Sequence, residues 1–83
     1  MQNLRGDKKA GPEAKFANYL QVGHRLFEFY LEFGQAEDQD EDVDPQIHTR
    51  IVTTPARAKA FLDALQQSAE RYEREFGPIR EEE

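Results

Sequence analysis

A nine-residue stretch, LFEFYLEFG over residues 26–34, constrains this chain more than any other feature. Large apolar residues alternate with glutamate and tyrosine, and a period of two is typical of a β-strand with one buried face. One face would carry Phe27, Phe29, Leu31 and Phe33, and the other Glu28, Tyr30 and Glu32. Because three phenylalanines on one face require burial, we expect this strand in the centre of a sheet.

Two further strands are predicted, one on each side of this stretch in the sequence. Residues 16–22 (FANYLQV) alternate in the same way, and Gly23-His24-Arg25 is predicted to turn the chain between the first two strands. Residues 47–54 (IHTRIVTT) are rich in β-branched side chains, which suit a pleated surface. Alternation puts His48 and Arg50 on the outer face. Asn18 falls on the core face, where we expect it to bond backbone groups near the start of the helix.

A long amphipathic helix is predicted after the third strand. Thr54 is a good N-cap, Pro55 suits the first helical position, and Gly77-Pro78 suits a left-handed end. Between them, one apolar stripe runs through Ala58, Phe61, Leu62, Leu65, Ala69, Tyr72 and Phe76. The pattern predicts an α+β domain over 15–79, in which a three-stranded antiparallel meander packs on one C-terminal helix (β-β-β-α). We expect a disordered tail over 1–14 and an acidic tail over 80–83.

The dimensions of these elements predict a homodimer. A helix of 22 residues is about 33 Å long, and a strand of eight residues about 27 Å, so the helix overhangs its sheet. Tyr72 and Phe76 would then lack cover within one chain. A domain of 83 residues is also marginal as a monomer, and a three-stranded sheet has two free edges. Edge pairing and exchange of helices are both open routes to the dimer.

The charge of the chain is concentrated in one segment. The net charge is −6, and residues 36–46 (AEDQDEDVDPQ) contain six carboxylates and no cation, so the remainder is neutral in sum. In this acidic loop over 35–46, aspartates at 38, 40 and 42 match the first ligands of an EF-hand. Val43 and Thr49 stand where that motif needs Gly and Glu, so no metal site is predicted. A solvated loop and an attraction for a basic partner both remain open.

The sequence contains no motif for catalysis, so we expect neither enzymatic activity nor a cofactor. It has no cysteine, no apolar run long enough to span a membrane and no secretory signal, which favours a cytoplasmic protein. His24, in the predicted turn, and His48 lack the spacing of a helical zinc site. Nucleic-acid binding is disfavoured because the folded part lacks a basic stripe. A regulator that uses the basic N-terminal tail (Arg5, Lys8, Lys9, Lys15) is the alternative function.

The outer face of the sheet is the candidate interaction surface. Alternation puts Arg50 beside Glu28 and Glu32, together with Tyr19 and Tyr30, and tyrosine and arginine are enriched at binding hot spots. A dimer interface or a plain solvated face would account for the same residues. We predict a small homodimeric interaction or adaptor module with a further, unidentified protein partner.

Several short motifs in this chain resemble a family of short bacterial proteins, domain of unknown function 3467. The matching segments are Phe16-Ala17-Asn18, Glu28-Phe29, Leu31-Glu32-Phe33-Gly34, Arg50-Ile51-Val52, Pro55, Ala58-Lys59, Tyr72-Glu73 and Phe76-Gly77. The family pattern has Tyr where this chain has Phe16, and Asp where it has Glu32. The resemblance covers about residues 15–79 and implies a bacterial origin and a shared fold, but no activity.

Overall fold

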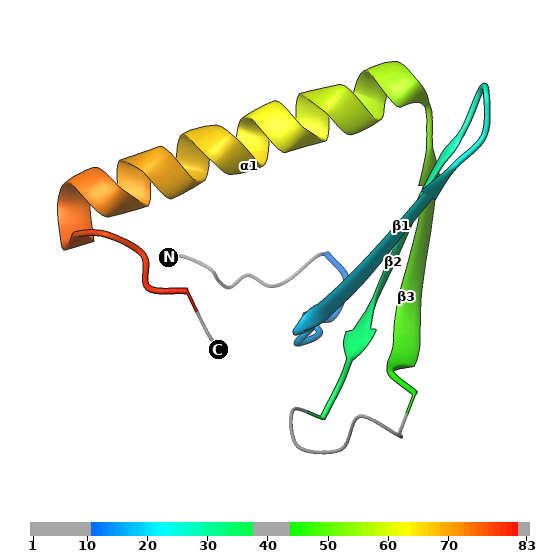
Figure 1. The fold of residues 1–83 in the computed structure, drawn as a ribbon, viewed down its shortest axis with the longest axis horizontal. Coiled ribbons are helices and arrows are strands. Elements are labelled where there is room, and N and C mark those ends of the chain that lie inside the picture. The colour runs from blue at the N-terminus through cyan, green and yellow to red at the C-terminus, as the bar shows by residue number, and fades with distance from the viewer. Residues whose placement is uncertain (1–10, 38–43, 82–83) are drawn as a thin grey trace.

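The computed structural model describes residues 11–37 and 44–81. Most of the predicted N-terminal tail (1–10), the centre of the acidic loop (38–43) and the last two residues lie outside the described residues. The elements are β1 (Tyr19–His24), β2 (Phe29–Gln35), β3 (Gln46–Thr53) and α1 (Pro55–Phe76). The predicted β-β-β-α order of an α+β fold is confirmed (Figure 1).

The three strands form one antiparallel sheet in the order β1-β2-β3, so the phenylalanine-rich strand is central as predicted. Val22 lies opposite Leu31, which lies opposite Ile51 on the other side. Residues directly opposite each other point to the same face. We call the apolar face that contains these three residues the inner face, and the opposite, polar face the outer face.

The hairpin between β1 and β2 turns two residues later than predicted. Arg25 N donates to Glu28 O at 2.8 Å, so Leu26 and Phe27 form the loop. The prediction that Phe27 shares the buried face was therefore wrong, and its side chain is 77% exposed. The later turn extends the pairing to His24, whose ring stacks on Phe29 with 5.6 Å between ring centroids. β1 correspondingly starts at Tyr19 and leaves Phe16 outside the sheet.

A β-bulge interrupts the pairing of β2 with β3. Phe33 pairs with Thr49, but Gly34 pairs with Ile47, so His48 is the extra residue. Gly34 is buried, and a Cβ atom built on it would lie 2.1 Å from the Gln46 carbonyl oxygen. The bulge also corrects a prediction. His48 shares a side of the sheet with Thr49, whose hydroxyl lies 2.7 Å from its ring, and not with Arg50.

Asn18 bonds backbone groups, but not at the predicted place. Its amide Nδ2 donates to Ala36 O at 3.1 Å, and Ala36 N donates to its Oδ1 at 2.8 Å. This two-way link fastens the start of β1 to the end of β2. The prediction that Asn18 lies near the start of the helix was wrong, because α1 follows the opposite end of the sheet, where Thr53 pairs with Phe29.

Both ends of α1 are where the sequence predicts them. Thr54 Oγ1 accepts from Arg57 N at 3.2 Å, and Pro55 occupies the first turn. At the C-terminal end, Gly77 N donates to Glu73 O at 2.9 Å. Gly77 has the expected positive φ of 102°, but its ψ of 174° is extended rather than left-handed helical. The chain therefore leaves the helix abruptly at this glycine.

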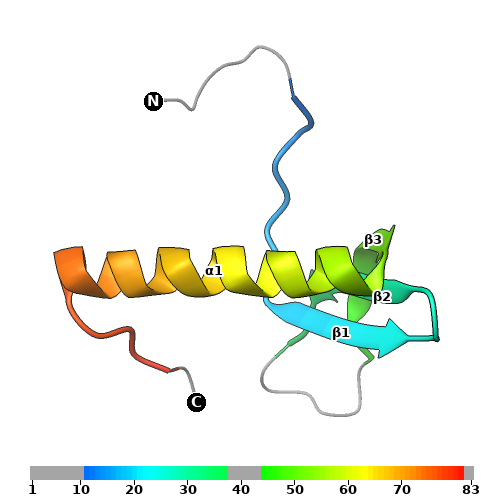
Figure 2. The same ribbon diagram turned by 90° about the horizontal axis from the view of Figure 1, so that it is seen from above.

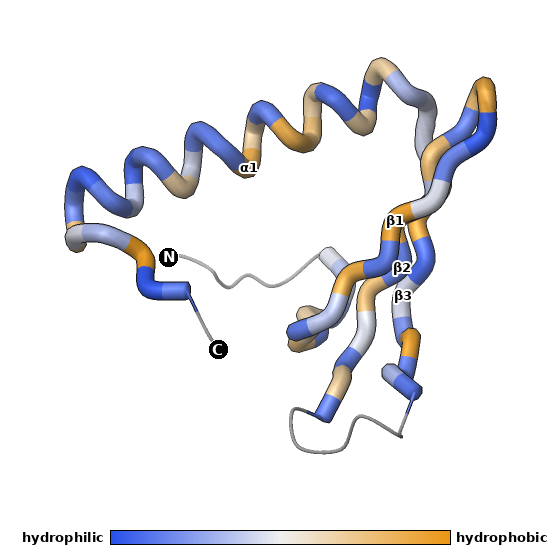
Figure 3. Tube along the Cα trace, in the orientation of Figure 1, coloured by the Kyte–Doolittle hydropathy of each residue, from blue (hydrophilic) through white to orange (hydrophobic). Residues whose placement is uncertain are grey.

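The helix diverges from the sheet, and the two enclose an open angle (Figure 1). Seen from above, the C-terminal half of α1 extends past the strands (Figure 2). Apolar positions recur along α1 and along all three strands (Figure 3). Even so, no hydrophobic side chain is buried among the described residues. Over residues 11–37 and 44–81, a single chain thus has the secondary structure of a domain without an enclosed core.

Candidate interaction surface

One row of side chains crosses the outer face of all three strands. Gln21 of β1 lies opposite Glu32 of β2, which lies opposite Arg50 of β3. Tyr19 precedes this row on β1, and Tyr30 neighbours it on β2. The regular alternation of the central strand therefore gathers these polar side chains on the face that α1 does not approach.

The side chains of this outer row are joined by direct contacts. Arg50 Nε lies 2.7 Å from Glu32 Oε2, and Gln21 Nε2 donates to Glu32 Oε1 at 3.3 Å. Tyr19 OH in turn donates to Gln21 Oε1 at 3.1 Å. Arg50 is 65% exposed and Glu32 only 20%, so the carboxylate is shielded while the guanidinium faces solvent. An exposed pair of this kind contributes about 0.2–1 kcal/mol to stability.

Tyr30 lies on the central strand of the outer face, near the hairpin between β1 and β2. The guanidinium carbon of Arg50 lies 5.8 Å from the centroid of the Tyr30 ring, and the guanidinium carbon of Arg25 lies 6.0 Å from the same centroid. Both distances allow a cation–π attraction. The Tyr30 hydroxyl donates to the carboxylate of Glu28, which holds the ring in one orientation. Arg25 was missed as a member of this surface because the sequence placed it in a turn.

The contact between Tyr30 and Glu28 can be tested by titration of the Tyr30 hydroxyl. The Glu28 carboxylate, as hydrogen-bond acceptor and as a neighbouring charge, raises the pKa of Tyr30 above its ordinary 10.0. Because the folded pKa is raised, the associated stabilisation is present below pH 10 and is lost as the pH rises through the folded pKa. We expect Glu28→Gln to lower the Tyr30 pKa, as measured by the pH dependence of its ¹³Cζ resonance. An unchanged midpoint would contradict the contact.

The two residues predicted for helix packing lie elsewhere. Tyr72 and Phe76 contact each other near the end of α1, with ring centroids 5.0 Å apart. Phe76 is 71% exposed, whereas Tyr72 is 49% exposed and borders a hollow with Pro78, Ile79 and Arg80 of the same chain. They therefore belong to a second, apolar surface that is separate from the outer row.

This apolar surface continues into a groove between α1 and the inner face of the sheet. The groove has a volume of ≈ 340 Å³. Its sheet side is lined by Leu20, Val22, Phe29, Leu31 and Phe33, and its helix side by Ala58, Phe61, Leu62 and Leu65. None of these side chains carries a charge, so the groove is suited to an apolar occupant and not to an ion.

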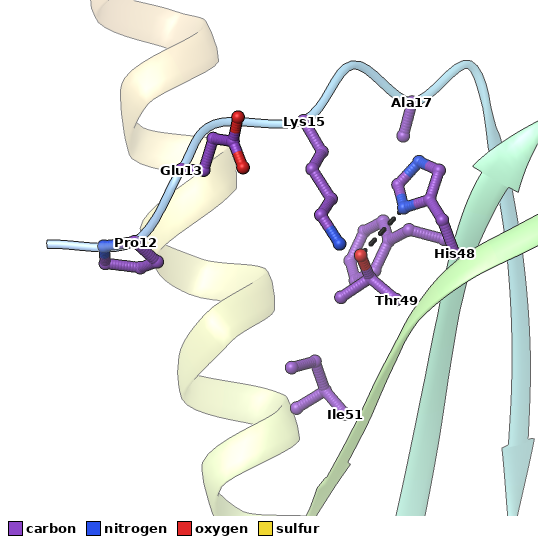
Figure 4. Close-up of a pocket in the computed structure, with 8 residues that line it drawn as sticks. Pro12, Glu13, Lys15, Ala17, His48, Thr49 and Ile51 are labelled. Atoms are coloured by element: carbon purple, nitrogen blue, oxygen red, sulfur yellow. Dashed lines mark hydrogen bonds between the residues drawn. The ribbon is translucent and has the colours of Figure 1, made fainter.

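A second hollow, of ≈ 490 Å³, lies where the segment before β1 crosses β3 (Figure 4). His48 Nε2 lies 2.9 Å from Phe16 O, and its Nδ1 lies 2.7 Å from Thr49 Oγ1. Since a carbonyl oxygen can only accept, Nε2 carries the proton and Nδ1 accepts from the Thr49 hydroxyl in the neutral ring. Both nitrogens of His48 are engaged, so it fastens the incoming segment to β3.

Within the described residues, the chain has neither a cluster of metal-ligating side chains nor a helix that could span a membrane. Across residues 11–37 and 44–81, no three histidine, aspartate or glutamate side chains cluster closely enough to hold a metal ion. The aspartates of the acidic loop at 38, 40 and 42 lie outside this range. Within the same part of the chain, α1 is too polar to cross a membrane.

Comparison with known proteins identifies one protein family that matches this chain. The model of a family described as "Protein of unknown function (DUF3467)" matches residues 6–81. No curated protein and no solved structure matches the chain. The match covers nearly the whole sequence and confirms the resemblance seen in its motifs.

Proposed function

Because the chain belongs to the DUF3467 family, whose description names no activity, we propose a function from its surfaces. The protein is a small, non-enzymatic homodimer that serves as a protein-interaction or adaptor module. The outer face of its sheet contacts a partner protein, and Tyr19, Tyr30 and Arg50 are the anchors of that contact. Glu28 and Glu32 orient two of these anchors.

The observation that supports this proposal most strongly is the connected outer row. Tyr30 and Arg50 are each held by a carboxylate, at Glu28 and Glu32, before any partner binds. Side chains that are already ordered lose less conformational entropy on association, which favours affinity. Tyrosine and arginine are also the residue types that most often dominate binding energy. The row therefore has the composition and the preorganisation of a binding site.

Removal of the anchors tests the proposal. We expect the triple variant Tyr19→Ala, Tyr30→Ala, Arg50→Ala to retain its fold, because all three side chains lie on the outer face. The amount of a partner protein that it captures from the native cell should fall about tenfold or more relative to the unaltered chain. Loss of two anchors that contribute about 1 kcal/mol each is enough for this effect. Quantitative mass spectrometry of the captured proteins measures the loss.

A matched control separates this effect from a general loss of charge. Arg71 lies on α1, away from the apolar stripe, so Arg71→Ala should leave capture unchanged. Circular dichroism shows whether each variant is folded. Capture that survives replacement of all three anchors in a folded protein would exclude this surface.

The salt dependence of binding distinguishes this function from nucleic-acid binding. The four charged residues of the outer face, Arg25, Arg50, Glu28 and Glu32, sum to zero. Binding through them should change little with ionic strength. Binding of phosphates by the basic tail would instead weaken by orders of magnitude between about 50 and 200 mM salt if several phosphates were neutralised.

A further inference from the structure

We propose that a second copy of this chain closes the open angle between sheet and helix. In this arrangement, the C-terminal half of each α1 packs on the inner face of its partner's sheet. The inference rests on the homodimer of the proposed function and specifies which surface makes it. The outer row then remains free on both subunits.

A single chain leaves more surface exposed than a compact monomer of its mass would. The chain exposes 7509 Å², whereas a compact monomer of 9.7 kDa exposes about 5,100 Å². A standard interface removes only about 800 Å² from each partner, and obligate homodimers often remove more. Part of the excess lies in residues 11–18 before β1, all of which are exposed. The exposed apolar side chains of the sheet and of α1 make up a further part.

The exposed apolar side chains gather in two places, on α1 and on the inner face of the sheet. The first half of α1 contributes Phe61, Leu62 and Leu65 to the groove, yet Leu65 is still 70% exposed. Beyond it, Tyr72 and Phe76 continue the same stripe in the C-terminal half of α1, which extends past the strands (Figure 2). The chain's own segment over 78–80 borders Tyr72 there. On the sheet, Leu20 and Phe33 pair at the end farthest from the start of α1. Residues 12–17 of the same chain lie beside Phe33 at that end of the sheet, yet Leu20, Leu65 and Phe76 remain 51%, 70% and 71% exposed. Each chain thus offers a half-helix and a half-groove that are only partly covered.

A second copy of the chain is the occupant that fits both places. A two-fold axis brings the half-helix of one chain to the half-groove of the other, and the same contact is made twice. The groove side chains are uncharged, so copies that each carry −6 meet there without local repulsion. Pairing of free sheet edges would satisfy backbone groups but would leave both inner faces and both half-helices exposed. The apolar surface therefore favours reciprocal packing of the helices over edge pairing.

A matched pair of charge insertions tests this interface. Leu65 lies in the apolar stripe, and Gln67, two residues on, lies on the opposite side of α1 at 100° per residue. We expect Leu65→Glu to raise the dissociation constant of the dimer by about 100-fold or more, as loss of a central apolar anchor does. Gln67→Glu should leave it unchanged. Light scattering over a dilution series measures both constants.

A second measurement uses the unaltered chain, in case Leu65→Glu does not fold. Labelled (¹³C, ¹⁵N) and unlabelled chains are unfolded, mixed and refolded, and an isotope-filtered NOESY then records contacts between subunits. We expect intermolecular contacts from the rings of Tyr72 and Phe76 to the methyl groups of Leu20 and Leu31. A dimeric mass without these contacts, or with contacts only along a strand edge, overturns this interface but leaves the homodimer. A monomeric mass overturns both.

Discussion

Gly34→Ala should disrupt the sheet, whereas Gly23→Ala should leave it intact. At Gly34, a Cβ atom would lie 2.1 Å from the Gln46 carbonyl oxygen, which is backbone and cannot rotate away. The β-bulge brings the two strands this close, so the added methyl group must push β2 and β3 apart. Overpacking of this kind costs about 1–3 kcal/mol or more, and the described part of the chain has no buried hydrophobic side chain to offset such a loss.

Gly23 is the matched control in the neighbouring strand. A Cβ atom there meets no atom within 4 Å, and its φ is not in the positive range that disfavours other residues. We expect Gly23→Ala to change the free energy of unfolding by less than about 0.5 kcal/mol. Urea denaturation of both variants at equal concentration, followed by circular dichroism, gives the comparison. Equal effects at the two positions would contradict the close approach at the bulge.

The second large effect is the dependence of stability on protein concentration. If folding requires a partner to cover the apolar surfaces, unfolding also separates the two chains. Each tenfold dilution then removes about 1.4 kcal/mol of stability. For a dimer of two 83-residue chains, this lowers the Tm by about 3–6 °C for each tenfold dilution. Circular dichroism melts over a hundredfold range of concentration measure the shift.

A monomer that folds alone gives a different result. Its Tm would be the same at every concentration, because unfolding would not change the number of particles. Gln67→Glu serves as the control, since it alters charge on the far side of α1 and should reproduce the concentration dependence of the unaltered chain. Melting temperatures that do not move with dilution would show that folding and association are independent.

Much of the fold could be predicted because its periodic signals are strong. The apolar stripe and the caps at Thr54 and Gly77 predict α1 with its observed bounds. Alternation over residues 29–33 predicts the central strand and both of its faces. The length of the helix predicts the exposure of Phe76. Each of these features depends on local propensity and on periodicity, which a single sequence contains.

The hairpin and the bulge could not be predicted, for a common reason. Phe27 extends the alternation of β2, so the sequence cannot show that pairing of His24 with Phe29 moves the turn onto it. The apolar pattern of β3 continues without a break at His48, so the sequence does not reveal that His48 is the extra residue of the bulge. Gly34 is the one clue, since a glycine inside a strand often marks a bulge.

The candidate site could be predicted where it depends on strand alternation, but not where it depends on the position of the turn. Tyr19, Tyr30, Glu32 and Arg50 share a face because β-strand alternation places them there. Arg50 contacts both Glu32 and Tyr30, and Gln21 links Tyr19 to Glu32. Arg25 could not be included because its approach to Tyr30 depends on the true position of the turn. The open angle between α1 and the sheet is a tertiary property, and the length of the helix only suggests it.

The most direct test of this account is the mass of the unaltered chain in solution. Light scattering at micromolar concentration should give twice the chain mass of 9.7 kDa, about 19 kDa. Such a value would agree with two copies covering each other's apolar surfaces. A folded species of 9.7 kDa at the same concentration would contradict the homodimer, and with it the interface inferred from the groove and from α1.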